Sequence, residues 1–144
     1  MKIGFASDHR GYKLKEELKN RLTNFEIIDY GTNSEESCDY PDFAFKLGEA
    51  VVSGDVTFGV AICGSGIGIS IACNKVKGIR CAKVSTSEEA KITRIDNDSN
   101  IVAFSEKVSV DEAVDIVNTF VNTEFSNLEK HQRRIDKITA YEER

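Results

Sequence analysis

The sequence predicts an α/β fold with a mostly parallel sheet, because short apolar runs alternate with amphipathic segments along the whole chain. Several of these runs are apolar throughout, as expected for parallel strands that are buried on both faces. The 144 residues contain no repeat, no low-complexity tract and no linker. We therefore expect one domain spanning residues 1–144.

The predicted strands are residues 2–6, 25–30, 57–62, 79–84 and 100–104. The first two predicted helices have one apolar face each, formed by Leu14, Leu18 and Leu22 and then by Phe43, Leu47, Ala50 and Val51. The third opens from the glycine-rich loop after Cys63. The next two are expected at residues 86–94 and 110–121. The last, residues 127–142, is polar with a thin apolar stripe that suits its own domain or, as we expect, a partner subunit.

The charge and the cysteine pattern exclude several classes of function. A net charge of −5 argues against nucleic acid or an anionic membrane as a partner, although a small anionic substrate remains compatible with it. No apolar run approaches the roughly 20 residues that span a bilayer, and the first residues predict a strand rather than a signal peptide, so we expect a cytoplasmic protein. The four cysteines form no C-x-x-C pair, and there are two histidines, so we expect reduced thiols and no metal.

The segment richest in chemistry is the run CGSGIGIS at residues 63–70, where a predicted strand ends and a helix begins. Its glycines let the backbone approach a ligand, and N–H groups at a helix start attract anions. The same partial positive charge favours the thiolate form of Cys63. A thiolate beside N–H donors suits abstraction of a proton next to a carbonyl, with the donors stabilising the enediolate. The alternative is that Cys63 is a small core residue in a tight turn.

Ile69 excludes two known motifs at this loop. A dinucleotide-binding fingerprint needs the spacing G-x-G-x-x-G, and a low-molecular-weight phosphatase needs Cys-x5-Arg. In both motifs the position of Ile69 would hold another residue. Of the remaining cysteines, Cys73 and Cys81 are expected to pack in the core, and Cys38 lies in a polar loop without an evident role.

Three other segments each have a functional and a purely structural interpretation. Asp8 and His9 follow the first strand, where they can cap a helix or can bind a sugar hydroxyl and a phosphate or ring oxygen. Tyr40 stands in a proline-marked helix start capped by Asp39, and is either part of that start or a substrate contact. The polar turn 96–100 is of a kind that usually satisfies its own backbone.

The last segment of interest lies in the predicted final helix. Lys130 and Arg134 are four residues apart on one helical face, where they form a cation pair suited to a phosphate or a solvated surface. His131 lies on the packing side, between Leu128 and Ile135, which is typical of a hydrogen-bonded core histidine.

Together these segments resemble the B-type ribose-5-phosphate isomerase family, which also contains the galactose-6-phosphate isomerase subunits. The motifs that carry the resemblance are SDHRG at 7–11, DYP at 39–41, ICGSGIGISIA at 62–72, NK at 74–75, GIR at 78–80 and HQRR at 131–134. The resemblance implies a three-layer α-β-α sandwich with a five-stranded parallel Rossmann-like sheet. It also implies a homodimer, or a dimer of dimers, with active sites shared between subunits and no cofactor.

The same resemblance implies a role for each site residue. Cys63 would move a proton between C1 and C2 of the open-chain sugar. Ser65, where many relatives carry threonine, would hydrogen-bond or shuttle a proton at the substrate oxygen. The backbone N–H groups of Gly64, Gly66, Gly68 and Ser70 would form an anion hole. Asp8, Tyr40 and Asn97 would bind the sugar hydroxyls or the enediolate. His9 would bind the phosphate together with Lys130 and Arg134 of the other subunit.

Two departures from the family pattern stand out. Lys130 replaces an arginine common in relatives, which keeps the charge and loses the bidentate fork. Asp96 stands where relatives carry a histidine that helps to open the furanose ring. A carboxylate can act as a base there but is a poor acid at neutral pH. Asp96 therefore works differently, or His9 or His131 substitutes, or the sugar ring opens spontaneously.

The resulting expectation is an enzyme of the pentose phosphate pathway that interconverts ribose 5-phosphate and ribulose 5-phosphate through an enediolate. One alternative is an isomerase for a six-carbon aldose 6-phosphate such as allose or galactose 6-phosphate. The loop 33–38 and the Asp96 turn are expected to set the sugar length. The other alternative is a non-catalytic phosphosugar-binding module, which would have no need of a thiolate at position 63.

Overall fold

The computed structural model describes residues 1–144 and contains one sheet of five parallel strands. The strands are β1 (Lys2–Ser7), β2 (Glu26–Asp29), β3 (Phe58–Cys63), β4 (Cys81–Lys83) and β5 (Ile101–Ser105), in the spatial order β2-β1-β3-β5-β4. The predicted five-stranded parallel sheet is therefore confirmed. Strand β1 has β2 on one side and β3 on the other, so the sheet changes winding direction between β1 and β3.

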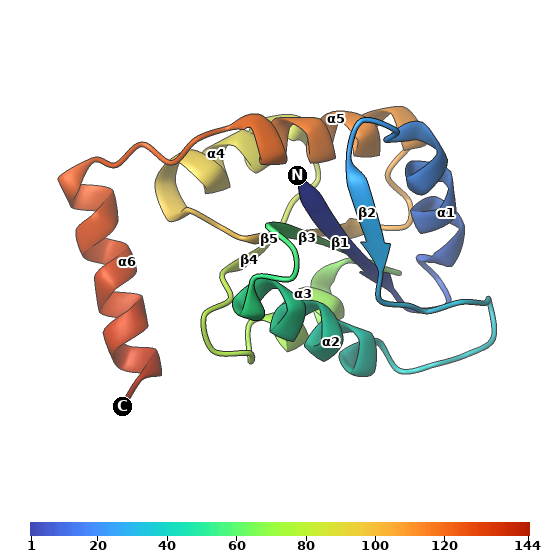
Figure 1. The fold of residues 1–144 in the computed structure, drawn as a ribbon, viewed down its shortest axis with the longest axis horizontal. Helices are drawn as coiled ribbons and strands as arrows, with labels where there is room; N and C mark the ends of the chain where they lie inside the picture. Colours follow the sequence, from blue (N-terminus) through green and yellow to red (C-terminus); the bar gives the residue numbers. More distant parts are fainter.

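The chain forms six helices, five of which cover the sheet. They are α1 (Tyr12–Arg21), α2 (Tyr40–Ser53), α3 (Ile67–Cys73), α4 (Ser87–Asn97), α5 (Val110–Asn122) and α6 (Glu129–Glu142). Helices α1, α4 and α5 cover one face and α2 and α3 the other, which gives the predicted three layers (Figure 1). None of the helices combines the length and the apolar character needed to cross a membrane.

Side-chain size alternates along the central strands, and this alternation explains how closely the helices pack on each face of the sheet. Large residues such as Phe5 and Phe104 point toward α1 and α5, whereas small ones such as Gly4 and Ala61 point toward α2 and α3. A Cβ atom on Gly4 would lie 2.7 Å from Leu47 of α2, so this helix packs closely on the sheet. Phe104 is fully buried, which contributes about 1.5–3 kcal/mol to stability.

Two predicted elements have different limits in the structure. The strand expected at 79–84 is only β4, because Arg80 N–H donates to the Asn100 side chain rather than to a strand. The helix expected at 86–94 continues to Asn97, so the predicted polar turn at 96–100 is wrong in its first half. Asp98 ends α4 in the left-handed conformation, φ 46°, and Arg94 Nη1 donates to its carboxylate at 2.8 Å.

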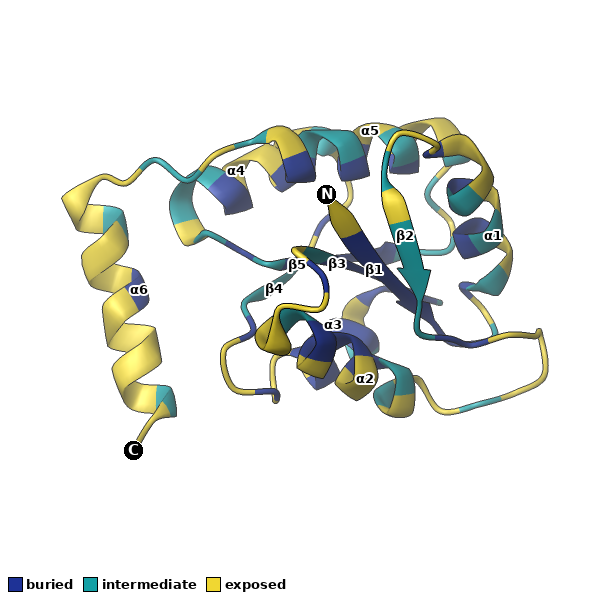
Figure 2. Ribbon diagram, viewed as in Figure 1, coloured by how far each residue is buried: buried dark blue, intermediate teal, exposed yellow.

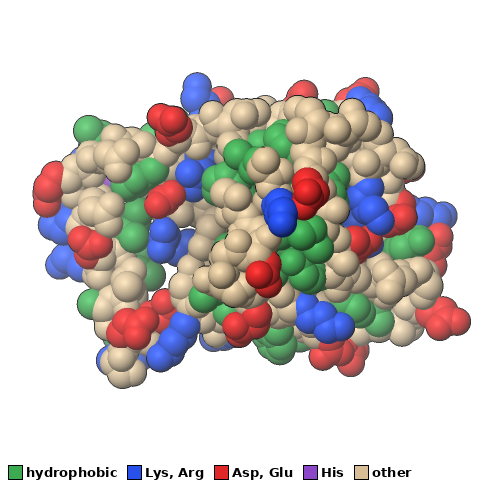
Figure 3. Space-filling model, viewed as in Figure 1, with side chains coloured by type: hydrophobic (Ala, Val, Ile, Leu, Met, Phe, Trp, Pro, Cys, Tyr) green, Lys and Arg blue, Asp and Glu red, His purple; other side chains and the backbone are tan.

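Helix α6 stands clear of the three layers (Figure 1). It packs on α4, and Ile135 is its one buried residue, while Ile138 and Tyr141 are exposed (Figure 2). Figure 3 shows hydrophobic side chains gathered on the side of α6 that faces the body, and acidic and basic side chains mixed over much of the same view. The chain therefore holds this helix by few contacts of its own.

Candidate active site

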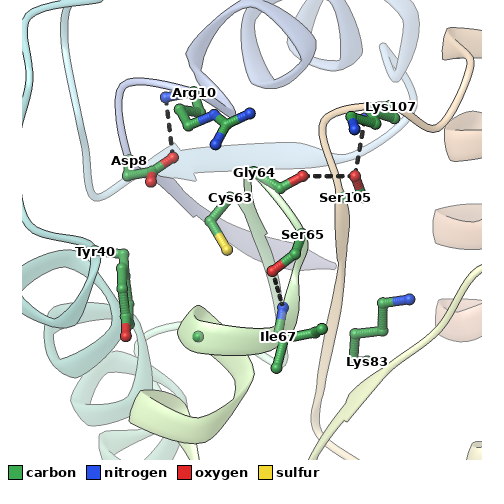
Figure 4. Close-up of a pocket in the computed structure, with 11 residues that line it drawn as sticks. Asp8, Arg10, Tyr40, Cys63, Gly64, Ser65, Ile67, Lys83, Ser105 and Lys107 are labelled. Carbon is green, nitrogen blue, oxygen red and sulfur yellow. Dashed lines mark hydrogen bonds between the residues drawn. The ribbon is translucent and has the colours of Figure 1, made fainter.

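A cavity of about 660 Å³ opens at the carboxyl ends of β1, β3 and β5, beside the point where the winding of the sheet changes direction. Ligands of open α/β sheets bind at such a point. Residues from three loops, two helix starts and the ends of β3, β4 and β5 line this cavity. Figure 4 draws them: Asp8, Arg10, Tyr40, Cys63, Gly64, Ser65, Ile67, Gly68, Lys83, Ser105 and Lys107. The sequence-predicted residues Asp8, Tyr40, Cys63, Gly64, Ser65 and Gly68 are thus brought together.

Cys63 is the last residue of β3 and lines the cavity although it is only 4% exposed. Its Sγ accepts the Gly66 N–H at 3.2 Å, and its carbonyl oxygen accepts the Glu106 N–H at 2.9 Å. The geometry therefore supports the chemical interpretation of Cys63, and burial alone does not make it a mere packing residue.

The loop after Cys63 carries hydrogen-bond donors without partners in the chain. The N–H groups of Gly64 and Ser65 donate to no other protein atom. Gly66 adopts φ 79°, and a Cβ on it would lie 2.7 Å from the backbone of Phe104, so only glycine fits. Ser65 Oγ accepts the Ile67 N–H at 3.1 Å, which leaves its own proton for another acceptor. Free donors beside a sulfur can stabilise an oxyanion.

Gly68 and Ser70 have different surroundings. A Cβ on Gly68 would lie 2.6 Å from the ring of Tyr40, so this glycine allows Tyr40 to lie against the start of α3 and face the cavity. Ser70 Oγ donates to the Ile67 carbonyl at 2.8 Å and does not line the cavity. The side chain of Ser70 therefore serves α3 itself.

Asp8 and His9 each take part in hydrogen bonds within the chain and also line a cavity. Asp8 Oδ1 accepts the N–H groups of Arg10 and Gly11 and so caps the turn into α1, while Oδ2 accepts no bond within the chain. His9 Nδ1 accepts the Cys38 N–H at 3.2 Å. A ring nitrogen that accepts carries no proton, so the proton of neutral His9 is on Nε2. His9, Asp8 and Tyr40 line an adjoining cavity next to the Cys63 cavity.

The sequence analysis missed four lining residues, namely Arg10, Lys83, Ser105 and Lys107. Arg10 Nη2 lies 3.3 Å from Glu106 Oε1, and its guanidinium packs against Gly64. The rule that ligands bind at carboxyl ends of strands, applied to the fifth predicted strand, would have found Ser105 and Lys107. Arg10, Lys83 and Lys107 outnumber the single acidic residue of the lining, Asp8, so the cavity is positive although the chain is acidic, which suits an anionic substrate.

Four predicted site residues lie elsewhere in this chain, namely Asp96, Asn97, Lys130 and Arg134. Asp96 Oδ1 lies 3.7 Å from His131 Nε2, which joins the end of α4 to α6. Asn97 lines a different cavity with Ile138 and Glu142 of α6. Lys130 and Arg134 are exposed on α6. A single chain therefore does not bring these four residues to Cys63.

The remaining predicted residues behave as packing and supporting groups. His131 is half-buried and its Nδ1 shares a hydrogen bond with Ser126 Oγ at 2.7 Å, which confirms a hydrogen-bonded packing histidine. Cys73 is fully buried, and its hydrogen bond with Cys81 together with burial raises the pKa of Cys81 well above its ordinary value. Cys73 belongs to the core cluster beneath α2 and α3 and Cys81 packs against it, so both cysteines pack as predicted.

An ion pair supports the loop that follows β2. The Lys15 side chain is fully buried, and its Nζ lies 2.6 Å from Asp29 Oδ2, which also accepts from Lys19. Burial alone would raise the pKa of Asp29, but hydrogen bonds from Lys15, Lys19 and the Gly31 N–H outweigh it and lower the pKa below its usual value. The bond to Gly31 fixes the strand end that pairs with Ser7, beside Asp8.

Comparisons with known proteins relate the whole chain to one family of enzymes. The sequence model of the Ribose/Galactose Isomerase family matches residues 3–138. Ribose-5-phosphate isomerase B of Escherichia coli is 41% identical over 99% of this chain and 97% of its own length. The structure of the Clostridium thermocellum enzyme of that name superposes with a TM-score of 0.96 at 49% identity, covering 99% of this chain and 98% of the other. The Mycoplasma genitalium enzyme with bound ribulose-5-phosphate has a TM-score of 0.91 at 37% identity, covering 99% and 96%.

Proposed function

The chain belongs to the ribose/galactose isomerase family, and from this premise we propose that it interconverts ribose 5-phosphate and ribulose 5-phosphate. The observation that carries the proposal is the Cys63 sulfur at the cavity wall, hydrogen-bonded by Gly66 N–H and adjacent to the free N–H groups of Gly64 and Ser65. A base beside oxyanion donors is the minimum that an aldose–ketose isomerase requires.

In the proposed reaction the Cys63 thiolate removes the proton from C2 of the open-chain aldose. The electron pair of that C–H bond forms the C1–C2 double bond, and the aldehyde oxygen becomes the enediolate oxygen facing the Gly64 and Ser65 N–H groups. Ser65 Oγ, whose proton is free, relays a proton between O2 and O1. Return of the proton from Cys63 to C1 completes the ketose, so atoms and charge balance.

Polar groups around Cys63 support the binding of the rest of the sugar. Asp8 Oδ2 has no partner in the chain and accepts a hydroxyl proton, and Tyr40 offers a phenol from the opposite wall (Figure 4). His9 Nε2–H points to a role as donor at the phosphate or ring oxygen, because Cys38 N–H occupies Nδ1. The open positive side of the cavity supports a dianionic substrate rather than a neutral sugar.

We further propose that a second copy of the chain completes the site with Asp96, Asn97, Lys130 and Arg134. The support is that these residues lie on α4 and α6, which pack on each other away from Cys63 of their own chain, and that α6 buries only Ile135. Lys130 and Arg134 would hold the phosphate. Asp96 and His131, 3.7 Å apart, would provide an acid–base pair where relatives carry a ring-opening histidine.

The test is steady-state turnover of ribose 5-phosphate by the purified chain, compared with allose 6-phosphate and galactose 6-phosphate. We expect a kcat/KM above about 10³ M⁻¹s⁻¹ for ribose 5-phosphate, the low end of the enzyme range. A higher kcat/KM for a six-carbon sugar would correct the substrate. Absence of turnover with all three would leave a binding function and refute the proposal.

A further inference from the structure

Two carbonyl groups, one at the end of β3 and one in the loop after it, accept hydrogen bonds from residues at the end of β5. The Cys63 carbonyl oxygen accepts the Glu106 N–H at 2.9 Å, and the Gly64 carbonyl oxygen accepts the Ser105 hydroxyl at 2.7 Å. Ser105 is the register partner of Cys63 in the β3–β5 pair, so the two strand ends lie side by side. None of the sequence motifs that the proposed function uses contains these residues.

These bonds decide which way the loop N–H groups point. In a planar trans peptide the carbonyl and the next N–H point in opposite directions. The Gly64 carbonyl points toward Ser105, away from the Cys63 sulfur and Asp8 (Figure 4). The Ser65 N–H of the same peptide therefore points toward the side of Cys63 and Asp8. The bond to Glu106 orients the Gly64 N–H by the same reasoning.

Ser105 is well suited to hold this orientation. Its Oγ accepts the Lys107 N–H at 3.1 Å, so its single proton is directed at the Gly64 carbonyl. Gly64 precedes Gly66 in the loop, and glycines allow peptide rotations that other residues do not. Without the hydroxyl, the Gly64–Ser65 peptide would lose the contact that keeps its N–H in the cavity.

We propose that Ser105 is a positioning residue for the oxyanion donors of the Cys63 loop, an inference that rests on the proposed isomerase function. Ser105 acts through the Gly64–Ser65 peptide and not on the substrate. Because the Ser65 N–H faces an oxygen that gains negative charge only during the reaction, its orientation matters more for the transition state than for substrate binding.

The test compares Ser105→Ala and Ser105→Thr with the control Ser53→Ala. Ser53 Oγ donates to the Ala50 carbonyl at 3.1 Å at the end of α2, so the control removes the same type of bond away from the cavity. We expect Ser105→Ala to lower kcat about 10- to 100-fold with KM changed less than about threefold, because removal of an oxyanion donor costs about 10²- to 10³-fold and rotation is a partial loss. Ser105→Thr keeps the hydroxyl and should retain kcat within about threefold of the wild type, a rescue that separates positioning from mere space filling.

Three outcomes would contradict the inference. They are a kcat of Ser105→Ala equal to the wild type, an equal loss in Ser105→Thr, or a fall in Tm beyond that of Ser53→Ala that accounts for the lost activity. Wild-type turnover of ribose 5-phosphate distinguishes failure of the role of Ser105 from failure of the proposed isomerase function. If the wild type is active and Ser105→Ala equals it, only the role of Ser105 fails. If the wild type turns over no sugar phosphate, the isomerase function fails and the role of Ser105 fails with it.

Discussion

Two regions of the molecule carry the predicted site residues, and they are built in opposite ways. The sheet edge, formed by Asp8, Tyr40, Cys63 and the loop 64–68, is enclosed by neighbouring strands and helices. The arm, formed by Asp96, Asn97 and helix α6, extends from the body and exposes Ile138 and Tyr141. The difference shows that one chain by itself assembles the proposed base and the neighbouring N–H donors, whereas Lys130 and Arg134 are exposed on α6 away from them.

The physical reason lies in how many contacts each region makes. At the sheet edge the Cys63 loop is held by β5, by Arg10 and by the Tyr40 ring, and glycine is needed where these approaches are closest. In the arm, Ile135 is the one buried residue of α6, and Arg80 and Asp98 hold the end of α4. The sheet edge is thus held in place by its own chain, whereas the arm would contribute to a site only if a second copy packed against it, as proposed above.

The largest expected effect tests the chemistry of the sheet edge. Cys63→Ala removes the proposed base and should lower kcat by about 10³-fold or more, since general-base catalysis contributes about 10²- to 10⁴-fold. Binding of ribose 5-phosphate, followed by calorimetry, should change little because the loop backbone remains. Cys73→Ala is the control, as it removes a core thiol outside the cavity. Retained turnover in Cys63→Ala would remove this residue as the base.

The second test asks whether the arm serves the sheet edge of another copy. Arg134→Ala should raise KM about 10- to 100-fold, because charged hydrogen bonds contribute about 1.5–3 kcal/mol. Mixing Arg134→Ala with Cys63→Ala under conditions of subunit exchange should then restore about a quarter of wild-type kcat/KM. Half of the random dimers are mixed, and each mixed dimer has one intact site.

The readout is kcat/KM at low substrate concentration before and after exchange, with each variant alone as the control. If Lys130 and Arg134 act on Cys63 of their own chain, every mixed dimer has two damaged sites and the activity equals the mean of the two variants. That result would contradict the proposal that the arm of one copy completes the site at the sheet edge of another.

The third test concerns the support beneath the sheet edge. Asp29→Asn removes the nearer of the two carboxylates that the buried Lys15 side chain contacts and leaves only Glu16, 3.4 Å away. We expect the free energy of unfolding to fall by about 3 kcal/mol, the lower end of the roughly 3–5 kcal/mol that breaking a buried pair costs. Urea denaturation measures the change. The control Glu26→Gln breaks an exposed pair with Lys2 and should change stability by about 0.5 kcal/mol or less.

The pH dependence of the same pair has a defined sign. Because the folded state lowers the pKa of Asp29, the stability it contributes is present above the unfolded value near 3.8 and is lost as the pH falls through the lower folded value. The stability difference between wild type and Asp29→Asn should therefore be constant from neutral pH to about pH 5 and shrink below pH 3.8. A difference that grows on acidification would contradict the assignment.

The smallest expected effect tests how Lys130 of the arm contacts the phosphate. Lys130→Arg supplies the bidentate fork found in relatives and should lower KM about two- to fivefold with kcat unchanged, because Arg pairs with phosphate more strongly than Lys does. Lys91→Arg, at an exposed lysine of α4 without an ion-pair partner, should change neither constant. An unchanged KM in Lys130→Arg would mean that Lys130 does not contact the phosphate.

The sequence by itself predicted the elements and the local chemistry of the sheet edge. The alternating pattern indicated five strands, and the run from Cys63 to Gly68 indicated a ligand loop at a strand end. These features depend on residues within a few positions of one another, where periodicity and turn preferences act. The same local signals predicted that Asp8 caps a helix start and that Cys73 and Cys81 pack in the core.

Only the tertiary structure decided which of these segments meet. It placed β5 between β3 and β4, and so brought Ser105 behind the loop of Cys63, 42 positions away along the chain by residue number. It also extended α4 to Asn97 and joined Asp96 to His131 rather than to Cys63. Neighbour relations between distant strands and helices follow from how large and small side chains pack across layers, which no local pattern encodes.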